Sequence, residues 1–506
     1  METVIEGKLG RGRGRLHVSP EGMTLLDQLG EHLGSADYAE VADVAAQGGR
    51  GGSRLIVTLT TGALWRLEGL HPLQARYGTE LIREQLGARA RRSLPLFSEK
   101  QILTQLRTAA QSLLSGSTRG VVDYLDFLLF QAALHGVSDV HLEPNAAGLQ
   151  VRFRLDGALI DVAELPTLWQ PRLMARLKVL AELEVYRSDL PQEGRFALRL
   201  SDRTVDCRTT LLPTLHGEKA VIRLFDSTRA LRELGELGMA PEVLTAWMDM
   251  LDRPQGLLLL TGPSNHGKTT TLYASLRHLH SKRRDLSNLC TVEDPIEHDL
   301  RVINQTQVNA GVGLTFAQGL RTVLRQDPEV IMVGEIRDEE TAEIAIRAGL
   351  TGHLILSSVH ASSAAGVFPR LVDLGCPAFL VASSVAGVMA QRLVRLVCSE
   401  CRIETALSDE ARSRWNLTTS DGLWVEGSGC HACGFTGYRG RTGLFELLAV
   451  DEALRQGVIS GRSPVELSAL AGPGVSLAEH GLRLAKAGRT SLAELERVLG
   501  APAACR

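Results

Sequence analysis

The segment Leu257-Leu-Leu-Leu-Thr-Gly-Pro-Ser-Asn-His-Gly-Lys-Thr-Thr-Thr271 is the part of this chain that most restricts its fold. Its apolar start predicts a buried strand, and an apolar helix is predicted to begin near Leu272. Between them, residues 262–269 match Gly-x-x-x-x-Gly-Lys-[Ser/Thr], the phosphate-binding loop. Loop amides and the helix N-terminus bind phosphate oxygens, Lys268 adds positive charge at the β and γ phosphates, and the Thr269 hydroxyl can coordinate Mg²⁺. The segment therefore predicts an ATP site.

Two residues of this loop are unusual, because Asn265 and His266 occupy positions where glycine and a small residue are usual. Asn is among the residues that best tolerate a positive φ, and the backbone N–H of His266 remains available to a phosphate. We therefore predict that ATP binding is retained and that the rate of turnover is the property these residues affect. The predicted nucleotide-binding residues are Gly262, Pro263, Ser264, Asn265, His266, Gly267, Lys268, Thr269 and Thr270.

The composition favours a multidomain cytoplasmic protein. A chain of 506 residues with 44% apolar residues is expected to form three or four domains. A formal net charge of −3 gives no general attraction to nucleic acid or acidic membranes. No apolar run approaches the ~20 residues that span a bilayer, and the N-terminus lacks the apolar core of a signal peptide. We therefore predict no direct membrane insertion and no nucleic-acid partner.

The sequence divides into six predicted segments. Residues 1–100 are predicted to form a small α/β domain, with strand-like alternation over 54–67 and Gly/Arg-rich breaks at 7–15 and 48–53. Residues 101–120 are predicted to be a linker, broken at Ser115-Gly-Ser117. The others are an α/β domain over 121–235, an ATPase core over 240–396, a cysteine-containing subdomain over 397–445 and a helical subdomain over 446–506 with helices at 451–460, 463–471 and 476–499.

The 121–235 segment is predicted to contain an antiparallel sheet. Alternating apolar and basic residues lead to the turn Asp156-Gly157, a strong hairpin signal, and a helix is predicted over 168–186. Further strands are predicted at 195–201, 204–211 and 219–225. Arginines recur on one face of these strands: Arg152, Arg154, Arg195, Arg199, Arg208 and Arg223.

The 240–396 segment alternates unbroken apolar strands with helices, which predicts a parallel sheet covered on both faces. The strands are expected at 257–261, 289–293, 329–334 and 353–358. Carboxylates stand at two strand ends: Glu335 is the candidate for holding Mg²⁺, and Glu293 for the general base, with Lys268 completing the charged set. Asp294 is an equally good candidate for the N-cap of a following helix. His360 is the candidate for contacting the γ-phosphate, and His353 is more simply explained as structural.

Four of the eight cysteines form a metal-binding pattern. Cys398 and Cys401, then Cys430 and Cys433, give C-x₂-C…C-x₂-C with 28 residues between the pairs. In a reducing compartment this spacing predicts a structural tetrathiolate Zn²⁺ site, since four thiolates leave no open position for catalysis. Cys207, Cys290, Cys376 and Cys505 show no pairing pattern.

From Ser138 to about Leu499, roughly seven-tenths of its length, the chain resembles the ATPases of type II secretion and type IV pilus assembly. The resemblance lies in Ser138-Asp-Val-His-Leu-Glu-Pro144, Leu190-Pro-Gln-Glu-Gly-Arg195, Leu212-Pro-Thr-Leu-His-Gly-Glu-Lys219, Thr291-Val-Glu-Asp-Pro-Ile-Glu297, Gly313-Leu-Thr-Phe-Ala317, Leu324-Arg-Gln-Asp-Pro328, Val333-Gly-Glu-Ile-Arg-Asp338, Leu350-Thr-Gly-His353 and Tyr438-Arg-Gly-Arg-Thr-Gly443. The chain departs from the family at Ser188-Asp189, where two arginines are usual, and in the run Ser357-Ser-Val-His-Ala361.

The resemblance implies a RecA-like ATPase core that assembles as a ring homohexamer and binds ATP, Mg²⁺ and Zn²⁺. It implies that residues 121–235 form a PAS-like domain that brings arginines to the phosphates, with Arg195 and Arg208 as the best matches. For Arg152, Arg154, Arg199 and Arg223 we prefer a position on the solvated sheet face. The family's partners would be an inner-membrane platform protein and a bitopic membrane protein bound through the N-terminal domain, at the cytoplasmic face of the inner membrane.

Three alternatives to a secretion motor remain. Extension of a type IV pilus differs only in the partner of residues 1–120. A nucleotide-binding scaffold that hydrolyses little would explain Asn265 and His266, although the lysine and both acidic residues persist. A DNA-translocating motor is disfavoured by the absence of a basic tract and by the cysteine insert.

Overall fold

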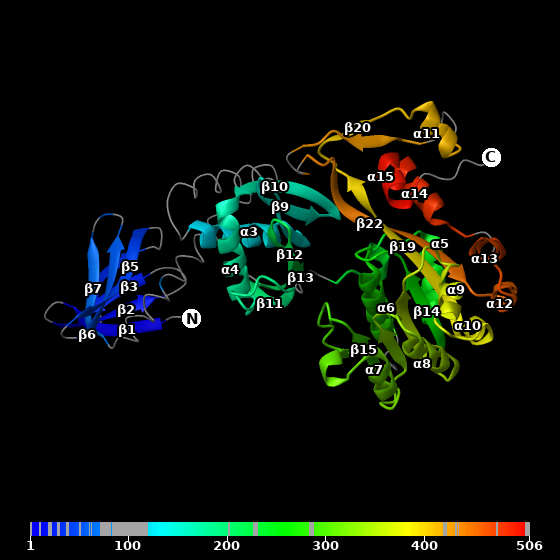
Figure 1. Cartoon of the computed structure of the whole chain (residues 1–506), viewed down its shortest axis with the longest axis horizontal. Coiled ribbons are helices and arrows are strands. Elements are labelled where there is room, and N and C mark those ends of the chain that lie inside the picture. Colours follow the sequence, from blue (N-terminus) through cyan, green and yellow to red (C-terminus); the bar gives the residue numbers. More distant parts are fainter. Residues whose placement is uncertain are drawn as a thin grey trace. The chain divides into compact units, whose positions relative to one another are not determined.

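The computed structural model describes two compact units, one built mainly from residues 1–97 and the other mainly from residues 98–506 (Figure 1). Figure 1 labels their helices and strands. The described residues are 3–9, 12–18, 23–27, 31–36, 40–49, 52–59, 61, 63–70, 82, 120–200, 203–225, 231–282, 288–417, 422–430, 433, 435–471 and 474–500. Among them, no helix is long and apolar enough to span a bilayer.

The first unit is a strand-rich domain. Its antiparallel strands follow the order β4-β3-β2-β1-β7-β6-β5, and alternate apolar side chains such as Leu16, Val18, Leu55 and Val57 are buried between them. The strands are β1 (Thr3–Leu9), β2 (Gly12–Val18), β3 (Met23–Asp27), β4 (His32–Ala36), β5 (Val41–Gly49), β6 (Gly52–Leu59) and β7 (Leu64–Leu70). The helical part of the predicted α/β domain, like the predicted linker before Gly120, lies outside the described residues apart from Ile82.

The predictions for this unit agree with its strands. The strand-like alternation over 54–67 belongs to two strands, because β6 ends at Leu59 and β7 begins at Leu64. Each Gly/Arg-rich stretch contains the boundary between two strands: β1 ends at Leu9 and β2 begins at Gly12, and β5 ends at Gly49 and β6 begins at Gly52. Glycine and arginine also extend into the paired strand ends on both sides of these boundaries.

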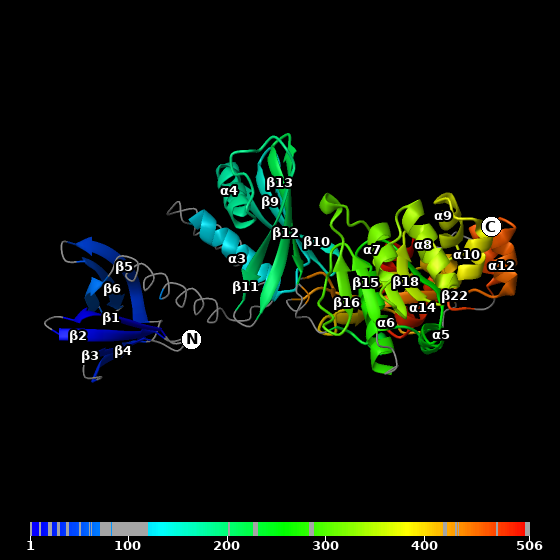
Figure 2. The ribbon, with the colours of Figure 1, turned by 90° about the horizontal axis from the view of Figure 1, so that it is seen from below.

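A six-stranded antiparallel sheet forms the 120–225 domain, in the order β10-β9-β8-β13-β12-β11. Its helices α3 (Gly120–Leu134) and α4 (Gln170–Leu180) lie on one face of the sheet (Figure 2), where the rings of Tyr124 and Trp169 pack edge to face 5.6 Å apart. The strands are β8 (Asp139–Pro144), β9 (Gly148–Leu155), β10 (Ala158–Pro166), β11 (Gln192–Arg199), β12 (Thr204–Thr214) and β13 (Gly217–Phe225).

The predictions for this domain were confirmed with one exception. Asp156 and Gly157 join β9 to β10 with φ values of 48° and 84°, the two positive values that a type I′ hairpin turn requires. The predicted helix at 168–186 is too long, since α4 ends at Leu180 and Glu182 has a φ of 57°. The chain then turns back to begin β11 at Gln192.

The ATPase core contains the predicted parallel sheet. Its order is β16-β15-β17-β18-β14-β19-β22, and all neighbours are parallel except β19 and β22. All four predicted strands are confirmed as β14 (Gly256–Thr261), β15 (Leu289–Glu293), β17 (Val330–Val333) and β18 (Leu354–Val359). The other elements are β16 (Asn304–Gln307), β19 (Val385–Val397), β22 (Tyr438–Ala449), α5 (Pro241–Leu251), α6 (Lys268–Lys282), α7 (Phe316–Val323), α8 (Glu339–Leu350), α9 (Val367–Asp373) and α10 (Ala378–Ser384).

Helices bury both faces of this sheet, as predicted. Leu257 and Leu259 of β14 pack into one apolar cluster with α7 to α10, while Leu258 and Leu260 pack into another with α5 and α6. The predicted boundaries at 396/397 and 445/446 fall inside β19 and β22, which pair with each other. The cysteine segment is therefore a long insertion between two strands of the core sheet.

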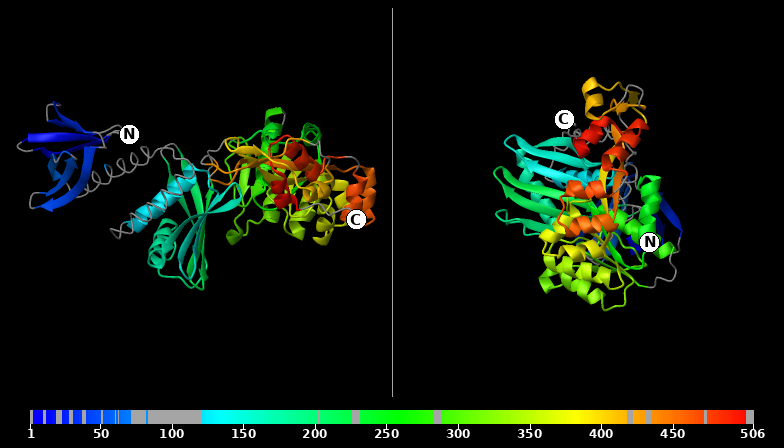
Figure 3. Two further views of the ribbon diagram at one scale, coloured as in Figure 1. Left: turned by 90° about the horizontal axis from the view of Figure 1, so that it is seen from above. Right: turned by 90° about the vertical axis from the view of Figure 1, so that its right-hand side faces the viewer.

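The segment between β19 and β22 holds the short strands β20 (Arg402–Glu404) and β21 (Val425–Gly427) and helix α11 (Asp409–Arg414). The predicted C-terminal helices are confirmed as α12 (Glu452–Ile459) and α13 (Pro464–Leu470), but the third prediction covers two helices, α14 (Leu477–Lys486) and α15 (Leu492–Leu499). The break falls at Gly488, whose φ of 65° ends the first of them. Both helices contact the β19–β22 pair (Figure 3).

Candidate nucleotide site

The phosphate-binding loop connects β14 to α6, as the sequence predicts. Gly262, Asn265 and Gly267 have positive φ values of 148°, 63° and 81°. A Cβ at Gly262 would lie 2.4 Å from the main-chain oxygen of Gln391, so this position excludes every other residue. Asn265 adopts the left-handed conformation that asparagine tolerates, and the departure from glycine is therefore compatible with the loop.

Lys268 is held by the loop itself. Its Nζ donates to the carbonyl oxygens of Gly262 and Pro263 at 2.8 and 2.9 Å. Burial lowers the pKa of this ammonium group, whereas the charge of Glu335 raises it. Ser264, Asn265, Lys268 and Thr269 line a cavity of about 480 Å³ at the carboxyl ends of the parallel strands. This is the position where open α/β sheets bind ligands.

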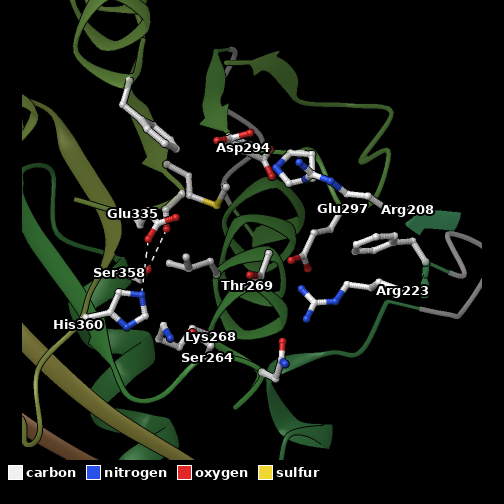
Figure 4. A pocket seen from close by; sticks show the side chains of 18 of the residues that line it. Arg208, Arg223, Ser264, Lys268, Thr269, Asp294, Glu297, Glu335, Ser358 and His360 are labelled. Atoms are coloured by element: carbon white, nitrogen blue, oxygen red, sulfur yellow. Dashed lines mark hydrogen bonds and ion pairs between the residues drawn. The ribbon is translucent and has the colours of Figure 1, made fainter. Parts of the chain in front are cut away.

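Glu335 and His360 form one side of this cavity (Figure 4). The Glu335 carboxylate, only 17% exposed, accepts a hydrogen bond from Arg337 at 2.5 Å and lies 3.5 Å from Nε2 of His360. Thr269 lines the same cavity (Figure 4). His353, at the other end of β18, is not among the residues that line this cavity.

Glu293 ends β15 and is among the residues that line the cavity, but its carboxylate is enclosed. The residue is 2% exposed. One oxygen accepts hydrogen bonds from Thr291 at 2.5 Å and Gln305 at 2.9 Å, and the other accepts one from the hydroxyl of Tyr273. A carboxylate with these three donors is poorly placed to take a proton from water.

Asp294 does not cap a helix. Residues 296–303 are described and contain no helix, so that interpretation was wrong. The side chain is exposed and lines the cavity instead. The rigid residue Pro295 follows it in a loop that leads to β16, and this loop carries the next acidic side chain, Glu297, back to the cavity.

Glu297 is a site residue to which the sequence analysis gave no role. Its side chain points into the cavity near Thr269 and Arg223 (Figure 4). Desolvation by the cavity walls raises the pKa of its carboxyl group, with the charge of Glu293 adding to the effect, while Arg223 and a hydrogen bond with Thr269 oppose it. The sequence did point to Glu297, because this residue ends the family motif that begins at Thr291. Its role could not be predicted, because the sequence of a loop does not show which way a side chain points.

Arginines of the 120–225 domain enter the cavity from the side opposite Lys268 (Figure 4). Cross-strand register places Arg154, Asp139, Arg223, Arg208 and Arg195 side by side on five strands. Of these, Arg208 and Arg223 line the cavity. Arg208 was predicted to reach the nucleotide, and it does line the cavity. Arg223 was assigned to the solvated face of the sheet, and that assignment was wrong because it also lines the cavity. Arg195, the other predicted arginine, is exposed and is not among the lining residues.

Asp139 anchors this row of arginines. Its carboxylate is 4% exposed and accepts from Nε of Arg223 at 2.9 Å, while Nε of Arg154 lies 3.5 Å away. The hydroxyl of Ser138 donates a further hydrogen bond at 2.8 Å. Because Nε of Arg223 is engaged, its two terminal nitrogens are free to face the cavity, the geometry that suits a planar guanidinium bound to a phosphate.

A second cavity of about 360 Å³ lies on the other side of the loop. Gly267 of the loop and Thr270 of α6 line it, together with Arg232 and Arg441. Asp156, at the β9–β10 turn, accepts from the main-chain N–H of Gly440 at 2.8 Å and lies 3.4 Å from Nε of Arg441. The 120–225 domain and the core therefore both line the space next to the phosphate-binding loop.

The four predicted metal ligands come together. The Sγ atoms of Cys398, Cys401, Cys430 and Cys433 all lie within 4.8 Å of one another. The pairs 398–430, 401–433 and 430–433 are each 3.8 Å apart. Tetrahedral Zn²⁺ with Zn–S distances of ~2.3 Å puts its sulfur atoms about 3.8 Å apart, so the donor set fits this ion. Although burial alone would raise the pKa of Cys433, N–H donors from Cys430 and Gly437 lower it to about 7.

The remaining cysteines are consistent with the prediction of no pairing: Cys207, Cys290 and Cys376 are free and buried, and Cys505 lies outside the described residues.

The fold and this site define a phosphate-binding-loop nucleotide hydrolase whose cavity is completed by a second domain. Comparison with known proteins identifies the family within this class of hydrolases. The family model "Type II/IV secretion system protein" matches residues 116–497. This chain belongs to that family.

Its relatives include the type II secretion system ATPase E of Vibrio cholerae, 43% identical over 381 residues that cover 75% of each chain. The type IV pilus assembly ATPase PilB of Thermus thermophilus is 40% identical over 370 residues, which cover 72% of this chain and 41% of PilB. The X-ray structure of the Legionella pneumophila ATPase DotB matches 76% of this chain and 96% of its own with a TM-score of 0.56 at 19% identity, which supports the RecA-like fold.

Proposed function

We propose that this chain hydrolyses ATP to ADP and phosphate and uses the reaction to drive pseudopilus assembly and protein export in a type II secretion system. One observation carries the proposal. A single cavity contains the loop lysine Lys268 and the strand-end carboxylate Glu335 of the core, together with Arg208 and Arg223 of the preceding domain. These are the groups that phosphoryl transfer needs.

The phosphates bind at the loop, with Gly262 to Thr270 supplying main-chain donors and Lys268 charge. The cavity lined by Gly267 and Thr270 on the other side of the loop accommodates the nucleoside. Thr269 and Glu335 would hold Mg²⁺, which would neutralise charge on the phosphates. Arg208, Arg223 and His360 face the transferred phosphoryl group, where delocalised cations stabilise its equatorial oxygens.

Glu297 is the group best placed to polarise water. A water oxygen attacks the γ-phosphorus, the bond from that phosphorus to the β–γ bridging oxygen breaks, and Glu297 takes the proton that water loses. Desolvation raises the pKa of this carboxyl group, which makes it a better base than an exposed glutamate. Glu293, which the sequence favoured as the base, instead fixes the end of β15 through Tyr273 and Gln305.

A phosphate-release assay on the full chain tests the activity. We expect Mg²⁺-dependent release of phosphate that falls at least about 1000-fold in Lys268→Ala and Glu335→Gln. The chain is assayed alone and fused to a hexamer-forming tag, because a ring arrangement changes how the domains close. No Mg²⁺-dependent release above that of Lys268→Ala in either form would leave a nucleotide-binding scaffold as the function.

We also infer a ring homohexamer at the cytoplasmic face of the inner membrane, in keeping with membership of the type II/IV secretion family. The core would act there against an inner-membrane platform protein. The strand-rich unit within residues 3–70 lies outside the family match and would bind the bitopic membrane partner. Co-purification of the full chain with the cytoplasmic segments of secretion and of pilus membrane proteins decides between these systems. Binding only to the pilus proteins would favour pilus extension, the activity suggested by the PilB relative.

The cysteine cluster would hold structural Zn²⁺. Four sulfur donors leave no open coordination position, so the ion would join the ends of β19 and β22 rather than take part in hydrolysis. Metal analysis of the purified chain should find one Zn²⁺ per chain, and Cys430→Ser with Cys433→Ser should lose it. A chain without bound metal and with four free thiols would exclude the site.

A further inference from the structure

His266 contacts β19 through its side chain. It is the largest departure from the usual phosphate-binding loop, and it is not among the residues that line either cavity beside the loop. Its ring packs against β19, where Nδ1 accepts a hydrogen bond from the main-chain N–H of Leu393 at 2.9 Å. An acceptor at Nδ1 means that this nitrogen carries no proton.

The N–H of Leu393 needs such an acceptor because of where β14 ends. Parallel pairing between β14 and β19 stops at Thr261 and Ala390, and within the described residues no strand pairs with β19 on that side beyond this point. The other edge of β19 continues to pair with β22, with Leu393 opposite Gly443. The imidazole nitrogen therefore takes the place of a strand carbonyl and extends the contact of β19 into the loop.

The loop main chain is attached to the same strand. Nε2 of Gln391 donates to the carbonyl of His266 at 2.9 Å, and Oε1 of Gln391 accepts from the hydroxyl of Thr271 at 2.8 Å. Gln391 of β19 thus contacts both the loop and the first turn of α6. The His266 ring adds a second contact between the loop and β19, at Leu393. Together they fix the loop on both sides of Gly267, next to Lys268.

We propose that His266 is a positioning residue that holds the phosphate-binding loop in its binding conformation before nucleotide arrives, and so raises the affinity of the chain for ADP and ATP. A loop that is already ordered loses less conformational freedom on binding. Serine, the usual residue at this position, is too short to reach Leu393. The inference rests on the proposed function, since it concerns the same nucleotide site.

The neutral ring is also the stable form here. Burial, together with the charges of Arg392 and Lys268, lowers the pKa of His266 to about 4. The acceptor at Nδ1 therefore persists at neutral pH.

Binding of a fluorescent ADP analogue to the full chain tests this role. In His266→Ser we expect the dissociation constant to rise about threefold to tenfold, the range for loss of one buried hydrogen bond. In His266→Asn it should stay within about twofold of the unsubstituted chain, because the asparagine Oδ1 takes the position of Nδ1. His280→Ser, the same substitution at an exposed position of α6, is the matched control. Equal affinity in the serine and unsubstituted chains, or an asparagine variant as weak as serine, would overturn the inference while leaving the proposed function intact.

Hydrogen exchange of residues 388–397 without nucleotide gives a readout independent of binding. The serine variant should exchange the Leu393 amide faster than the unsubstituted chain and the asparagine variant. Equal exchange in all three shows that the contact does not hold the loop and overturns the inference. A chain that binds no nucleotide at all overturns the proposed function, and with it the effect on affinity.

Discussion

The two walls of the nucleotide cavity are built differently. On the core side, Lys268, Thr269 and Glu335 stand at the ends of buried parallel strands or in the loop that follows one, so the main chain determines their positions. On the other side, Arg208 and Arg223 extend from the open face of an antiparallel sheet, and one buried carboxylate, Asp139, orients Arg223. The main chain fixes the core wall, whereas the arginine wall depends on side-chain ion pairs.

This difference separates binding from catalysis. In the proposed mechanism the core wall would bind nucleotide by itself, because loop amides and Lys268 would contact the phosphates. The arginine wall is needed when charge develops on the transferred group. Changes to the phosphate-binding loop of the core wall should therefore alter affinity and rate together, whereas changes to the arginine wall should mainly alter the rate.

The largest effect is expected at the acidic residues of the core wall. Glu297→Gln should lower kcat about 1000-fold, because it removes the group that takes the proton from water, with little change in ADP affinity. Glu293→Gln keeps three hydrogen-bonding partners near its amide and should lower kcat only about tenfold. Steady-state phosphate release and ADP binding measure the two quantities. If Glu293→Gln were the more damaging substitution, the enclosed carboxylate would be the base.

A smaller loss is expected on the arginine wall. Arg223→Ala should lower kcat about 100-fold and change the dissociation constant of ADP less than about threefold, because its charge is needed chiefly in the transition state. Arg199→Ala, at the exposed end of β11, is the control and should retain full activity. An equal loss in affinity and rate for Arg223→Ala would mean that the two walls do not divide the work in this way.

Removing the anchor of Arg223 should have a weaker effect of the same kind. Asp139→Asn keeps the shape but removes the charge that orients the guanidinium, so we expect kcat to fall about tenfold at unchanged ADP affinity. Asp161→Asn, a hydrogen-bonded aspartate on β10 of the same sheet, is the matched control. A loss in Asp139→Asn that persists when Arg223 is already alanine would show that Asp139 acts by another route.

The smallest expected effect is on the pH dependence of stability, and it arises from His266 in the phosphate-binding loop. The pKa of His266 is lowered to about 4 by burial and by Arg392, Lys268, Arg497 and Arg441. Because the pKa of His266 is lower in the folded chain than in the unfolded chain, its neutral ring contributes to the free energy of unfolding. This contribution is complete above pH ~6.5, the unfolded pKa, and is lost as the pH falls toward 4. Between pH 7 and 4.5 the unsubstituted chain should therefore lose about 1–2 kcal/mol more stability than His266→Asn. Thermal unfolding at a series of pH values measures the difference, and parallel pH curves would contradict it.

Much of this site could be predicted because its signals are local. The loop, the strand before it and the helix after it are contiguous, so residues 262–269 had to form a phosphate-binding loop wherever the sheet lay. The four clustered cysteines could be recognised because each pair, C-x₂-C, is a short local motif. Alternation along β9, β12 and β13 also placed the arginines on one sheet face correctly.

The fold class, the residues of the loop, the strand-end carboxylates and the four cysteines that cluster could all be predicted from the sequence alone. Three features depended on the tertiary structure: the donors that enclose the Glu293 carboxylate, the choice of Arg208 and Arg223 from the row of arginines, and the contact of His266 with β19. Strand pattern sets the face on which a side chain lies, but its neighbours depend on register between strands far apart in the chain. Arg223 meets Asp139 across 84 residues, and His266 meets Leu393 across 127, separations over which no local pattern carries information.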